Sequence, residues 1–444
     1  MRTERSILEQ AGLASGLLTE EQIDHAWQML VESQPVAHLS LEEITDKQLA
    51  EQLVALEYIN RWQAEQLCHG RTKFTLGSYR ILDAIGHGGM GWVFQGEHVL
   101  LGRIEAIKVL PKNQTNQNSI ASFCREIRAQ ALLDHPNLVR LSYADTDGET
   151  YFLVTEYVPG TDLRRLVRTH GPLSQEQAAV IISQAAQALG YAHTQGLIHR
   201  DVKPGNLLIT LEGNTKLTDL GLAVFSDDAA AIESKPKHIV GTADFLAPEV
   251  IVQPGEVHSI SDVYSLGCTL YYAVTGKVPY PSGDTADKLR RQLDDEPIAP
   301  QRLNPEVDDS FAEVIKEMMQ KRPADRIPTA ADVVKRLQPW VASAGQNVNR
   351  SIGVLAEIQT DQGFYEATLA DTVVATYEKT ETPSLPASSL KDLSLVSKRN
   401  NTPPPVIAEP EQEGTSLLSR PMMFLVAVAV LVAVLAVVLI FKVS

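Results

Sequence analysis

The feature that most constrains this sequence is a polar run at residues 199–206, which is followed after a short apolar stretch by Asp219. The run places a carboxylate at Asp201, a cation at Lys203 and a carboxamide at Asn206. Phosphoryl transfer needs groups of this kind, because its loose, anionic transition state is stabilised by positioned cations and metal ions. Asn206 and Asp219 supply the oxygen ligands that Mg²⁺ prefers. The pattern therefore predicts a site for phosphoryl transfer.

These residues resemble the catalytic and metal-binding loops of bacterial eukaryotic-type (Hanks-type) Ser/Thr protein kinases. The resemblance implies that Asp201 accepts the proton of the substrate hydroxyl and that Lys203 lies near the transferring phosphoryl group. It also implies that Asn206 and Asp219 hold Mg²⁺, with Mn²⁺ as the alternative ion. In that family Lys203, in the Asp-x-Lys-x-x-Asn arrangement, favours Ser and Thr over Tyr as acceptors. His199 is expected to pack and to form hydrogen bonds rather than to act as a base.

Length, charge and cysteine content limit the class of protein. With 444 residues, 44% of them apolar, the chain exceeds one ordinary domain and can bury a sizeable core. A formal net charge of −16 argues against a general nucleic-acid-binding protein, because counterion release at phosphates requires clustered Lys and Arg. Cys68, Cys124 and Cys268 are far apart and suggest neither a zinc site nor a disulfide framework, which favours a reducing cytosol. Residues 1–30 lack the apolar run of a secretory signal.

Residues 1–70 have the pattern of a small helical module. Thr19 and Gln22 have the spacing of a capping box, and Asn60 and Gln63 repeat it. The sequence shows no convergent polar groups there, so packing or recruitment is expected rather than catalysis. Similar helical preludes occur in planctomycete-like kinases, a resemblance that implies no specific role. We expect this module to be the place for a homodimer contact or an unidentified partner.

From Tyr79 the apolar period becomes that of strands, and residues 86–91 form a Gly-rich connection. Alone, such a motif equally fits a dinucleotide site or a structural turn. A dinucleotide loop opens a helix, whereas residues 92–94 continue as a strand and Lys108 follows in Ala-Ile-Lys, as in kinases. The resemblance implies that backbone N–H groups and Lys108 bind the ATP phosphates. The expected ATP contacts in this region are Ile85, Gly86, His87, Gly88, Gly89, Met90, Gly91, Val93, Ala106 and Lys108.

Two further segments match the family around the nucleotide. Glu126, in a predicted helix, falls where the family's lysine-pairing glutamate falls, and the pairing would orient Lys108. The apolar strand at residues 151–158 breaks at Pro159-Gly160, which fits the hinge between two kinase lobes. The resemblance implies three more ATP contacts, at Glu156, Val158 and Leu208.

The polar segment from Phe225 to Val240 lacks periodicity and is expected to be a loop. Arg200, next to Asp201, is a cation that needs an anion, and a phosphate on this loop would supply one. Ser234 is the first candidate for that phosphate and Ser226 is the second.

Residues 241–249, which end in Ala-Pro-Glu, match the family's substrate-docking segment. Within it Thr242 is expected to have a structural role near the catalytic loop. The resemblance implies that Glu249 pairs with a buried Arg326. It also implies that Asp262 holds the backbone of the catalytic loop.

The last part of the sequence has linker composition followed by an apolar run. Residues 341–420 contain few aromatics and collect Thr, Ser, Pro and Glu, which predicts a flexible tether. Residues 422–441 carry no charge and, at ~1.5 Å per residue, are long enough to cross ~30 Å of hydrocarbon as a helix. We therefore expect a single-pass, tail-anchored protein that binds the lipid bilayer of the cell membrane, with residues 1–420 in the cytoplasm.

Together these observations predict an α+β, two-lobed protein kinase fold at residues 79–340, with a small β-rich N-lobe and a large helical C-lobe. The expected function is ATP- and Mg²⁺-dependent phosphorylation of Ser and Thr in cytoplasmic proteins and in the chain itself. A membrane-tethered adaptor that only binds ATP is one alternative, which the complete set of Lys108, Asp201, Asn206 and Asp219 disfavours. A small-molecule phosphotransferase is the other, and the peptide-docking segment argues against it.

Overall fold

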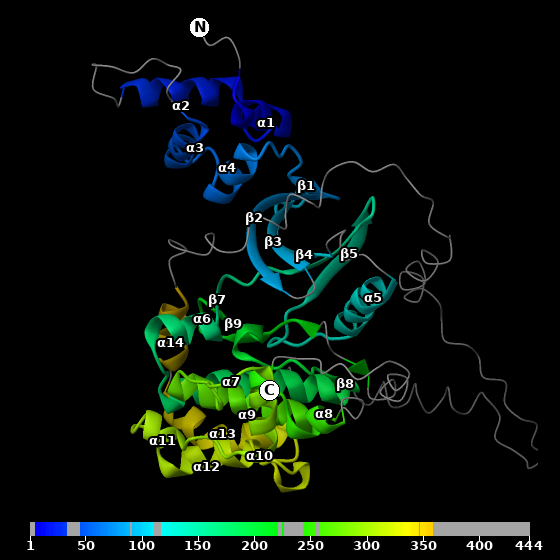
Figure 1. The fold of residues 1–444 in the computed structure, drawn as a ribbon, viewed down its shortest axis with the longest axis vertical. Helices are drawn as coiled ribbons and strands as arrows, with labels where there is room; N and C mark the ends of the chain where they lie inside the picture. Colours follow the sequence, from blue (N-terminus) through cyan, green and yellow to red (C-terminus); the bar gives the residue numbers. More distant parts are fainter. Residues whose placement is uncertain are drawn as a thin grey trace, which may run out of the picture. The chain divides into compact units, whose positions relative to one another are not determined.

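The computed structural model describes residues 5–32, 45–88, 91–110, 117–220, 224–225, 243–253, 258–345 and 347–357. The described elements are a helical module, a lobe built on a β-sheet and a helical lobe (Figure 1). The expected two-lobed α+β fold is therefore confirmed.

The helical module contains α1 (Ile7–Ser15), α2 (Glu20–Glu32), α3 (Asp46–Ala55) and α4 (Arg61–Cys68). Each of these helices begins with a reciprocal pair of hydrogen bonds between a polar N-cap residue and a Glu or Gln three residues later. The pairs predicted at Thr19 and Asn60 both form. Ser6 and Thr45 begin α1 and α3 in the same way, so one capping device starts every described helix of the module.

The small lobe is built on an antiparallel sheet with strand order β1-β2-β3-β4-β6-β5. Its strands are β1 (Thr75–Leu76), β2 (Tyr79–Gly88), β3 (Gly91–His98), β4 (Ile104–Val109), β5 (Leu141–Asp147) and β6 (Thr150–Glu156). α5 (Gln117–Ala131) packs on one face, where Phe123 clusters with Leu110 and Leu153. Lys108 lies on this face too, because it pairs with Leu153 across the β4–β6 ladder.

The opposite face of the sheet packs against the helical module. Along β4 the alternate residues Ile107 and Val109 are buried, and they belong to one apolar cluster with Leu53 and Leu67 of the module. Successive strand residues point to opposite faces, so the residues that face the module alternate with those that face α5. The sheet is therefore covered by helices on both faces.

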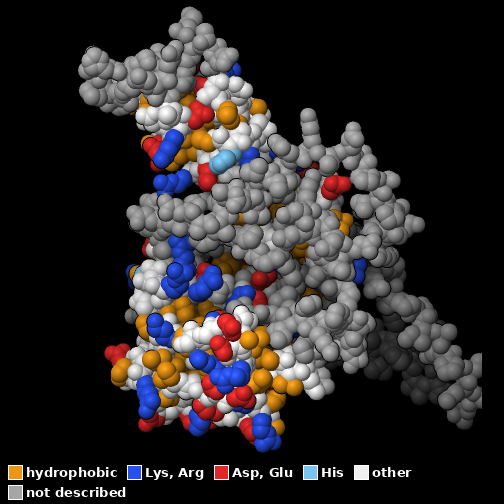
Figure 2. All heavy atoms as spheres, viewed as in Figure 1, with side chains coloured by type: hydrophobic (Ala, Val, Ile, Leu, Met, Phe, Trp, Pro, Cys, Tyr) orange, Lys and Arg blue, Asp and Glu red, His pale blue; other side chains and the backbone are white. Residues whose placement is uncertain are grey.

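The described part of the helical lobe carries two small β-structures. Its helices are α6 (Leu163–His170), α7 (Gln175–Thr194), α8 (Pro248–Val252), α9 (Ser259–Thr275), α10 (Thr285–Asp294), α11 (Pro300–Leu303), α12 (Asp309–Met318), α13 (Ala330–Ser343) and α14 (Val348–Ala356). β7 (Gly160–Asp162), β9 (Leu207–Thr210) and β10 (Thr215–Leu217) form one sheet, and β8 (Leu197–Ile198) pairs with β11 (Val224–Phe225). The 3₁₀ turns in the described residues are η2 (Pro204–Asn206), η5 (Ala243–Phe245) and η6 (Pro323–Asp325). On the described surface in Figure 2, Lys and Arg side chains lie among Asp and Glu side chains.

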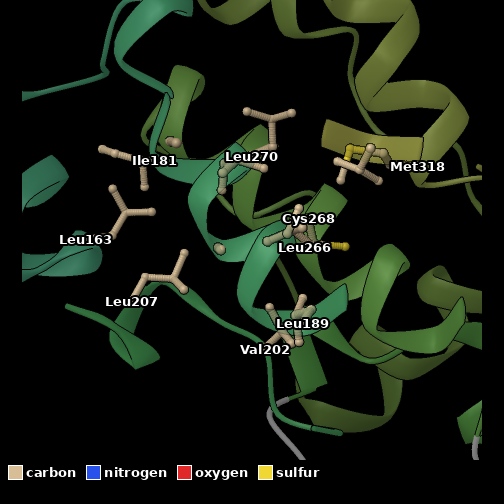
Figure 3. Close-up of a cluster of buried hydrophobic side chains, with 14 of the residues drawn as sticks. Leu163, Ile181, Leu189, Val202, Leu207, Leu266, Cys268, Leu270 and Met318 are labelled. Atoms are coloured by element: carbon tan, nitrogen blue, oxygen red, sulfur yellow. The ribbon is translucent and has the colours of Figure 1, made fainter. Parts of the chain in front are cut away.

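The core of the helical lobe holds the catalytic segment in place. α9 is buried along nearly its whole length, and its Leu266 belongs to the same apolar cluster as Leu189 of α7 (Figure 3). Val202, the residue after Asp201, inserts into this cluster and is 1% exposed. Leu207, which follows the polar run, is fully buried there as well. The segment between them is thus anchored at both ends by apolar packing.

The flexible tether expected from residue 341 does not begin there. α13 runs to Ser343, and α14 packs Ile352 and Ala356 into the core of the helical lobe. A Cβ on Gly353 would lie 2.0 Å from the carbonyl oxygen of Leu211, in the turn between β9 and β10. Linker composition was misleading here because a few small and apolar residues suffice to dock a short helix.

Several predicted features lie outside the described residues. They are the tether beyond residue 357, the apolar segment at 422–441, and Gly89, Met90, Ser226, Ser234 and Thr242. Within the described ranges, no helix combines the length and the apolar character that a membrane crossing requires.

Candidate active site

Asp201 lies at the centre of a hydrogen-bonded loop between β8 and η2. Its Oδ2 atom is 2.5 Å from Lys203 Nζ and accepts a hydrogen bond from Asn206 Nδ2 at 3.3 Å. The same Asn206 nitrogen donates to the backbone oxygen of Asp201 at 2.8 Å. Asp201 is 8% exposed and Asn206 is 5% exposed. The structure therefore brings together the carboxylate, cation and carboxamide that the sequence placed in one run.

Asp262, in the first turn of α9, holds the backbone of this loop as the resemblance implied. Its two carboxylate oxygens accept from the backbone N–H groups of His199 and Arg200, both at 2.9 Å. His193, near the end of α7, places Nε2 2.8 Å from Asp262 Oδ2. Burial by itself would raise the pKa of Asp262, but these hydrogen bonds and the two histidines more than offset it, so its pKa is lowered. The buried carboxylate therefore stays ionised and fixes the loop.

His199 connects the catalytic loop to the segment before Asp219. Its Nε2 lies 3.1 Å from the Thr218 carbonyl oxygen, and its Nδ1 accepts from the Asp201 backbone N–H at 3.3 Å. A carbonyl can only accept, so Nε2 carries the proton in this arrangement. Both ring nitrogens are thus used for structure, in agreement with the expectation that His199 is not the base.

Asp219 forms an ion pair with Lys108 of β4, in which Nζ donates to Oδ1 at 2.7 Å. Burial acts to raise the pKa of Asp219, but Lys108, His199 and Lys203 more than offset this, so the pKa is lowered. The backbone φ angles of Asp219 and Arg200 are 68° and 69°, a region that residues other than glycine rarely adopt. Strain of this kind concentrates at functional sites. Asp219 therefore lies ionised beside the cation expected to bind phosphate.

Asn206 and Asp219 also fit a divalent cation by donor type. The hydrogen bonds of the Asn206 side chain use Nδ2, so its amide oxygen is the atom left for an ion. The Asp219 side chain is ionised and 40% exposed. No cluster of three or more His, Cys, Asp or Glu that could hold a metal occurs in the part of the chain that the structure describes. This donor set suits Mg²⁺, which takes one or two protein oxygens and completes its shell with water and phosphate.

The Gly-rich hairpin expected over the phosphates is formed by β2 and β3. Gly86, His87 and Gly88 are the last residues of β2, and Gly91 is the first residue of β3. Two bulges interrupt the β2–β3 ladder, each with one extra residue on β2, at Leu82 and Ile85. Next to the hairpin, Val93 pairs with Lys108 and Ala106 pairs with Thr155. The predicted nucleotide contacts that are described on β3 and β4 therefore lie on neighbouring strands.

The predicted hinge follows β6, where Glu156 is the last strand residue and Val158 lies just beyond it. The Glu156 carboxylate accepts from Lys216 Nζ of β10 at 2.9 Å and from the Arg140 backbone N–H at 2.8 Å. The side chain thus ties the hinge to the helical lobe, a role that the sequence did not indicate.

Glycine is required directly after the hinge. Gly160 begins β7 with φ 138°, and a Cβ there would lie 2.0 Å from the carbonyl oxygen of Ile209 on β9. This close approach seats β7 beside β9, the strand that carries Leu208. Glu126, the remaining predicted partner of Lys108, belongs to α5, but its side chain lies outside the described residues.

The docking segment is anchored by a buried ion pair. Arg326, whose side chain is fully buried, donates from Nη1 and Nη2 to the two carboxylate oxygens of Glu249 at 2.8 and 3.0 Å. Ser261 Oγ donates to the same carboxylate at 2.7 Å. Burial acts to raise the pKa of Glu249, but Arg326 and Ser261 more than offset it, so the pKa is lowered. The pairing implied by the resemblance is therefore present.

Two residues of α10 also hold the docking segment in place. The sequence did not predict this role. Gln292 is fully buried and donates to the Asp244 backbone oxygen at 2.8 Å, while its own oxygen accepts from Tyr264 Oη at 2.6 Å. Lys288 pairs with the Asp244 carboxylate at 2.8 Å. The contact of His193 with Asp262 was not predicted either. The one available indication was that His193 lies six residues before His199 in the sequence. No local sequence pattern indicates the roles of Gln292 and Lys288, because their partners are distant in sequence.

Arg200 is a half-buried cation whose Nε atom is itself buried. Its Nε atom has no hydrogen-bond partner among the described residues. Burial lowers the pKa of Arg200, and the nearby Asp262 opposes this. A buried donor without a partner is costly, so an anion at this place would be stabilised.

Comparison with known proteins agrees with this geometry. Residues 79–341 match the family model described as "Protein kinase domain". The chain is 34% identical over 258 residues to serine/threonine-protein kinase PrkC of Bacillus subtilis, covering 58% of this chain and 39% of that protein. It is 34% identical over 261 residues to serine/threonine-protein kinase PknB of Mycobacterium leprae, covering 57% of this chain and 42% of that protein.

A probable serine/threonine-protein kinase of Corynebacterium efficiens, CE0033, is matched over more of the chain. It is 31% identical over 349 residues, or 76% of this chain and 52% of that protein. The chain thus covers between 39% and 52% of the length of these relatives. With the kinase-domain match spanning most of the sequence and the site assembled as described, the chain belongs to the protein kinase family.

Proposed function

We propose that this chain is an ATP- and Mg²⁺-dependent protein Ser/Thr kinase that phosphorylates cytoplasmic proteins and itself. The observation that carries the proposal is the buried Asp201, in contact with Lys203 at 2.5 Å and Asn206 at 3.3 Å, and fixed through its loop by Asp262. Lys203 at this position favours Ser and Thr acceptors. The names of the relatives from Bacillus subtilis and Mycobacterium leprae give the same acceptor class for those proteins.

In the proposed reaction the hydroxyl oxygen of Ser or Thr bonds to the γ-phosphorus of ATP, while the bond to the β–γ bridging oxygen breaks and ADP leaves. Asp201 accepts the hydroxyl proton. Lys203 neutralises charge beside it, and Lys108 binds phosphate from the sheet side. Asn206 and Asp219 would hold Mg²⁺, which when bound neutralises the phosphate oxygens.

Transfer of labelled phosphate from ATP to a generic protein, with and without Mg²⁺, tests the proposal on the full chain. We expect labelled phosphoserine and phosphothreonine, and we expect Asp201→Asn to lose them. A chain that binds ATP but labels no acceptor would be the ATP-binding adaptor. A chain that labels only small molecules would be the alternative phosphotransferase.

We propose that a phosphate in the segment after Asp219 activates the enzyme by pairing with Arg200. The buried Nε of Arg200, which has no hydrogen-bond partner among the described residues, supports the proposal. Ser234 is the first candidate and Ser226 the second. Mass spectrometry of the autophosphorylated chain tests this, because an active enzyme without phosphate between Phe225 and Thr242 would rule the switch out.

We also propose that residues 422–441 anchor the chain in the cell membrane, with the kinase domain in the cytoplasm. The proposal is supported by the uncharged apolar composition of this segment. A homodimer contact or partner site on residues 1–70, and a likeness of those residues to planctomycete-like kinases, stay predictions.

A further inference from the structure

The helical module and the Gly-rich hairpin share one apolar cluster. Trp62 of α4 packs its ring against Phe74, with centroids 5.8 Å apart, and against Phe94 of β3, with centroids 5.9 Å apart. Phe94 pairs with Ile107 in the next strand, whereas its neighbour Val93 pairs with Lys108. The module therefore contacts the hairpin on the face opposite the one that carries Lys108.

Asn60 joins the start of α4 to the hairpin by two different hydrogen bonds. Its Oδ1 accepts from the Gln63 backbone N–H at 2.8 Å and caps the helix. Its Nδ2 donates to the Leu82 backbone oxygen on β2 at 2.7 Å. In the described residues, the N-cap side chains of the other module helices, Ser6, Thr19 and Thr45, hydrogen-bond only within their own helix starts.

The acceptor of this second hydrogen bond, the Leu82 backbone oxygen, belongs to a β-bulge. Leu82 is the extra residue of the first bulge in β2, between the pairs Ile81–Gly96 and Asp83–Gln95. A bulge bends its strand and increases its twist, so it sets the direction of the residues beyond it. On β2 those residues include the second bulge, at Ile85, and the glycines that end the strand. A side chain that holds the first bulge therefore helps to aim the hairpin.

We propose that Asn60 is a positioning residue for nucleotide binding, through which the helical module holds the bulged strand of the Gly-rich hairpin. The proposal rests on the kinase function proposed above, because it takes that hairpin as the ATP phosphate site. The module is then part of the nucleotide-binding lobe. It acts on ATP binding from the far side of the sheet, without contacting the nucleotide.

Asn60→Asp in the full chain isolates the second hydrogen bond. Asp is as good an N-cap as Asn, so α4 keeps its cap. The variant lacks the Nδ2 donor and turns a carboxylate toward the Leu82 oxygen. Asn60→Ser keeps a capping oxygen without adding a charge, but its side chain is too short to reach the Leu82 oxygen. One hydrogen bond corresponds to roughly 3- to 10-fold in an equilibrium constant, so we expect both variants to raise KM for ATP by about that factor. We expect kcat at saturating ATP to change less than about 2-fold.

Thr45→Ala is the matched control, because it removes the cap of α3, whose N-cap side chain bonds only to Gln48. It should lower the Tm of the chain and leave the ATP KM unchanged. An unchanged KM in both Asn60 variants would overturn the proposal. So would an equal rise in Thr45→Ala, since a loosened module would then explain the effect.

ATP affinity measured by calorimetry, without an acceptor protein, separates this proposal from the proposed function. If the natural chain binds ATP but transfers no phosphate, the kinase function fails while the Kd ratios still test Asn60. If the natural chain transfers phosphate and all Kd values are equal, the role of Asn60 fails alone.

Discussion

At the scale of single residues, the site depends on charges held at fixed distances. Asp201→Asn removes the proton acceptor but keeps the shape of the side chain, so it should lower kcat by roughly 10²- to 10⁴-fold. ATP affinity should change less than kcat, because in the proposed reaction Asp201 acts on the acceptor hydroxyl rather than on ATP. Steady-state kinetics with a peptide acceptor measure this, with circular dichroism to show that the variant is folded. Near-normal turnover would contradict the role assigned to Asp201.

The Glu249–Arg326 pair gives a stability prediction at the same scale. Removing one partner of a buried ion pair costs about 3–5 kcal/mol, so Glu249→Gln should lower the free energy of unfolding by that amount at pH 7. The folded-state pKa of Glu249 lies below its usual value of 4.5. Its contribution is therefore fully present above about pH 4.5 and is lost as pH falls through the folded pKa. The difference between the natural chain and the variant should shrink on acidification.

Urea unfolding at pH 7 and at acidic pH measures this difference. Glu317→Gln is the control, because its 2.6 Å contact with Arg336 is partly exposed, with 33% and 47% of the side chains accessible. Exposed pairs contribute about 0–1 kcal/mol, so this variant should lie close to the natural chain. An equal loss of unfolding free energy in both variants would contradict the prediction, because burial would then make no difference to the contribution of the ion pair.

The residues that were predicted and those that were missed differ in where their partners lie. Asp201, Lys203 and Asn206 occupy one short run, and their types and spacing indicate the chemistry directly. Lys216 and Gln292 act through partners far along the chain, at Glu156 and at the docking segment. Only the folded chain brings such pairs together, so a sequence pattern could not identify them.

At the scale of elements, α14 is the feature that composition misread. Its contact with the β9–β10 turn needs glycine on both sides, since a Cβ on Gly213 would lie 1.9 Å from the Asn349 backbone oxygen. Gly353 faces Leu211 at a similar distance of 2.0 Å. A segment rich in small and polar residues is typical of a linker, and nothing local distinguishes glycines that permit a close contact from glycines that loosen a chain.

Gly353→Ala tests this contact because two effects oppose each other. Alanine favours a helix over glycine by about 1 kcal/mol. The added methyl group would meet backbone, which cannot move aside cheaply, and overpacking costs roughly 1–3 kcal/mol. We expect a net loss of stability in thermal unfolding. Val354→Ala, at an exposed position of the same helix (64% accessible), should change stability by less than about 0.5 kcal/mol. A stabilised Gly353→Ala would show that α14 does not depend on the close contact.

At the scale of the whole molecule, the sequence separated the helical module from the strands of the sheet but did not show how the two join. The helices of residues 5–68 and the strands from Tyr79 were separated by the change in apolar period. The shared cluster around Trp62 was not visible, because each segment taken alone looks like a complete amphipathic element. Which face covers which is decided by the three-dimensional fit of large side chains. The same limit applies to Asn60. Its capping role could be predicted from the sequence, whereas its hydrogen bond to Leu82 could not.

The membrane anchor proposed for residues 422–441 belongs to this scale as well. Twenty uncharged apolar residues exceed what a helix in a soluble core normally needs, and they would span the hydrocarbon with Arg420 and Lys442 at either side. Those flanking charges do not set the orientation, so the proposed cytoplasmic location of the kinase domain rests on its use of ATP and on the reduced-thiol composition of the chain. We expect the full chain to stay with the membrane fraction after carbonate washing, and a chain ending at residue 421 to be released. Protease added outside intact cells should leave the kinase domain whole. Release of the full chain by carbonate would disprove the anchor, and digestion of the kinase domain from outside would disprove the orientation.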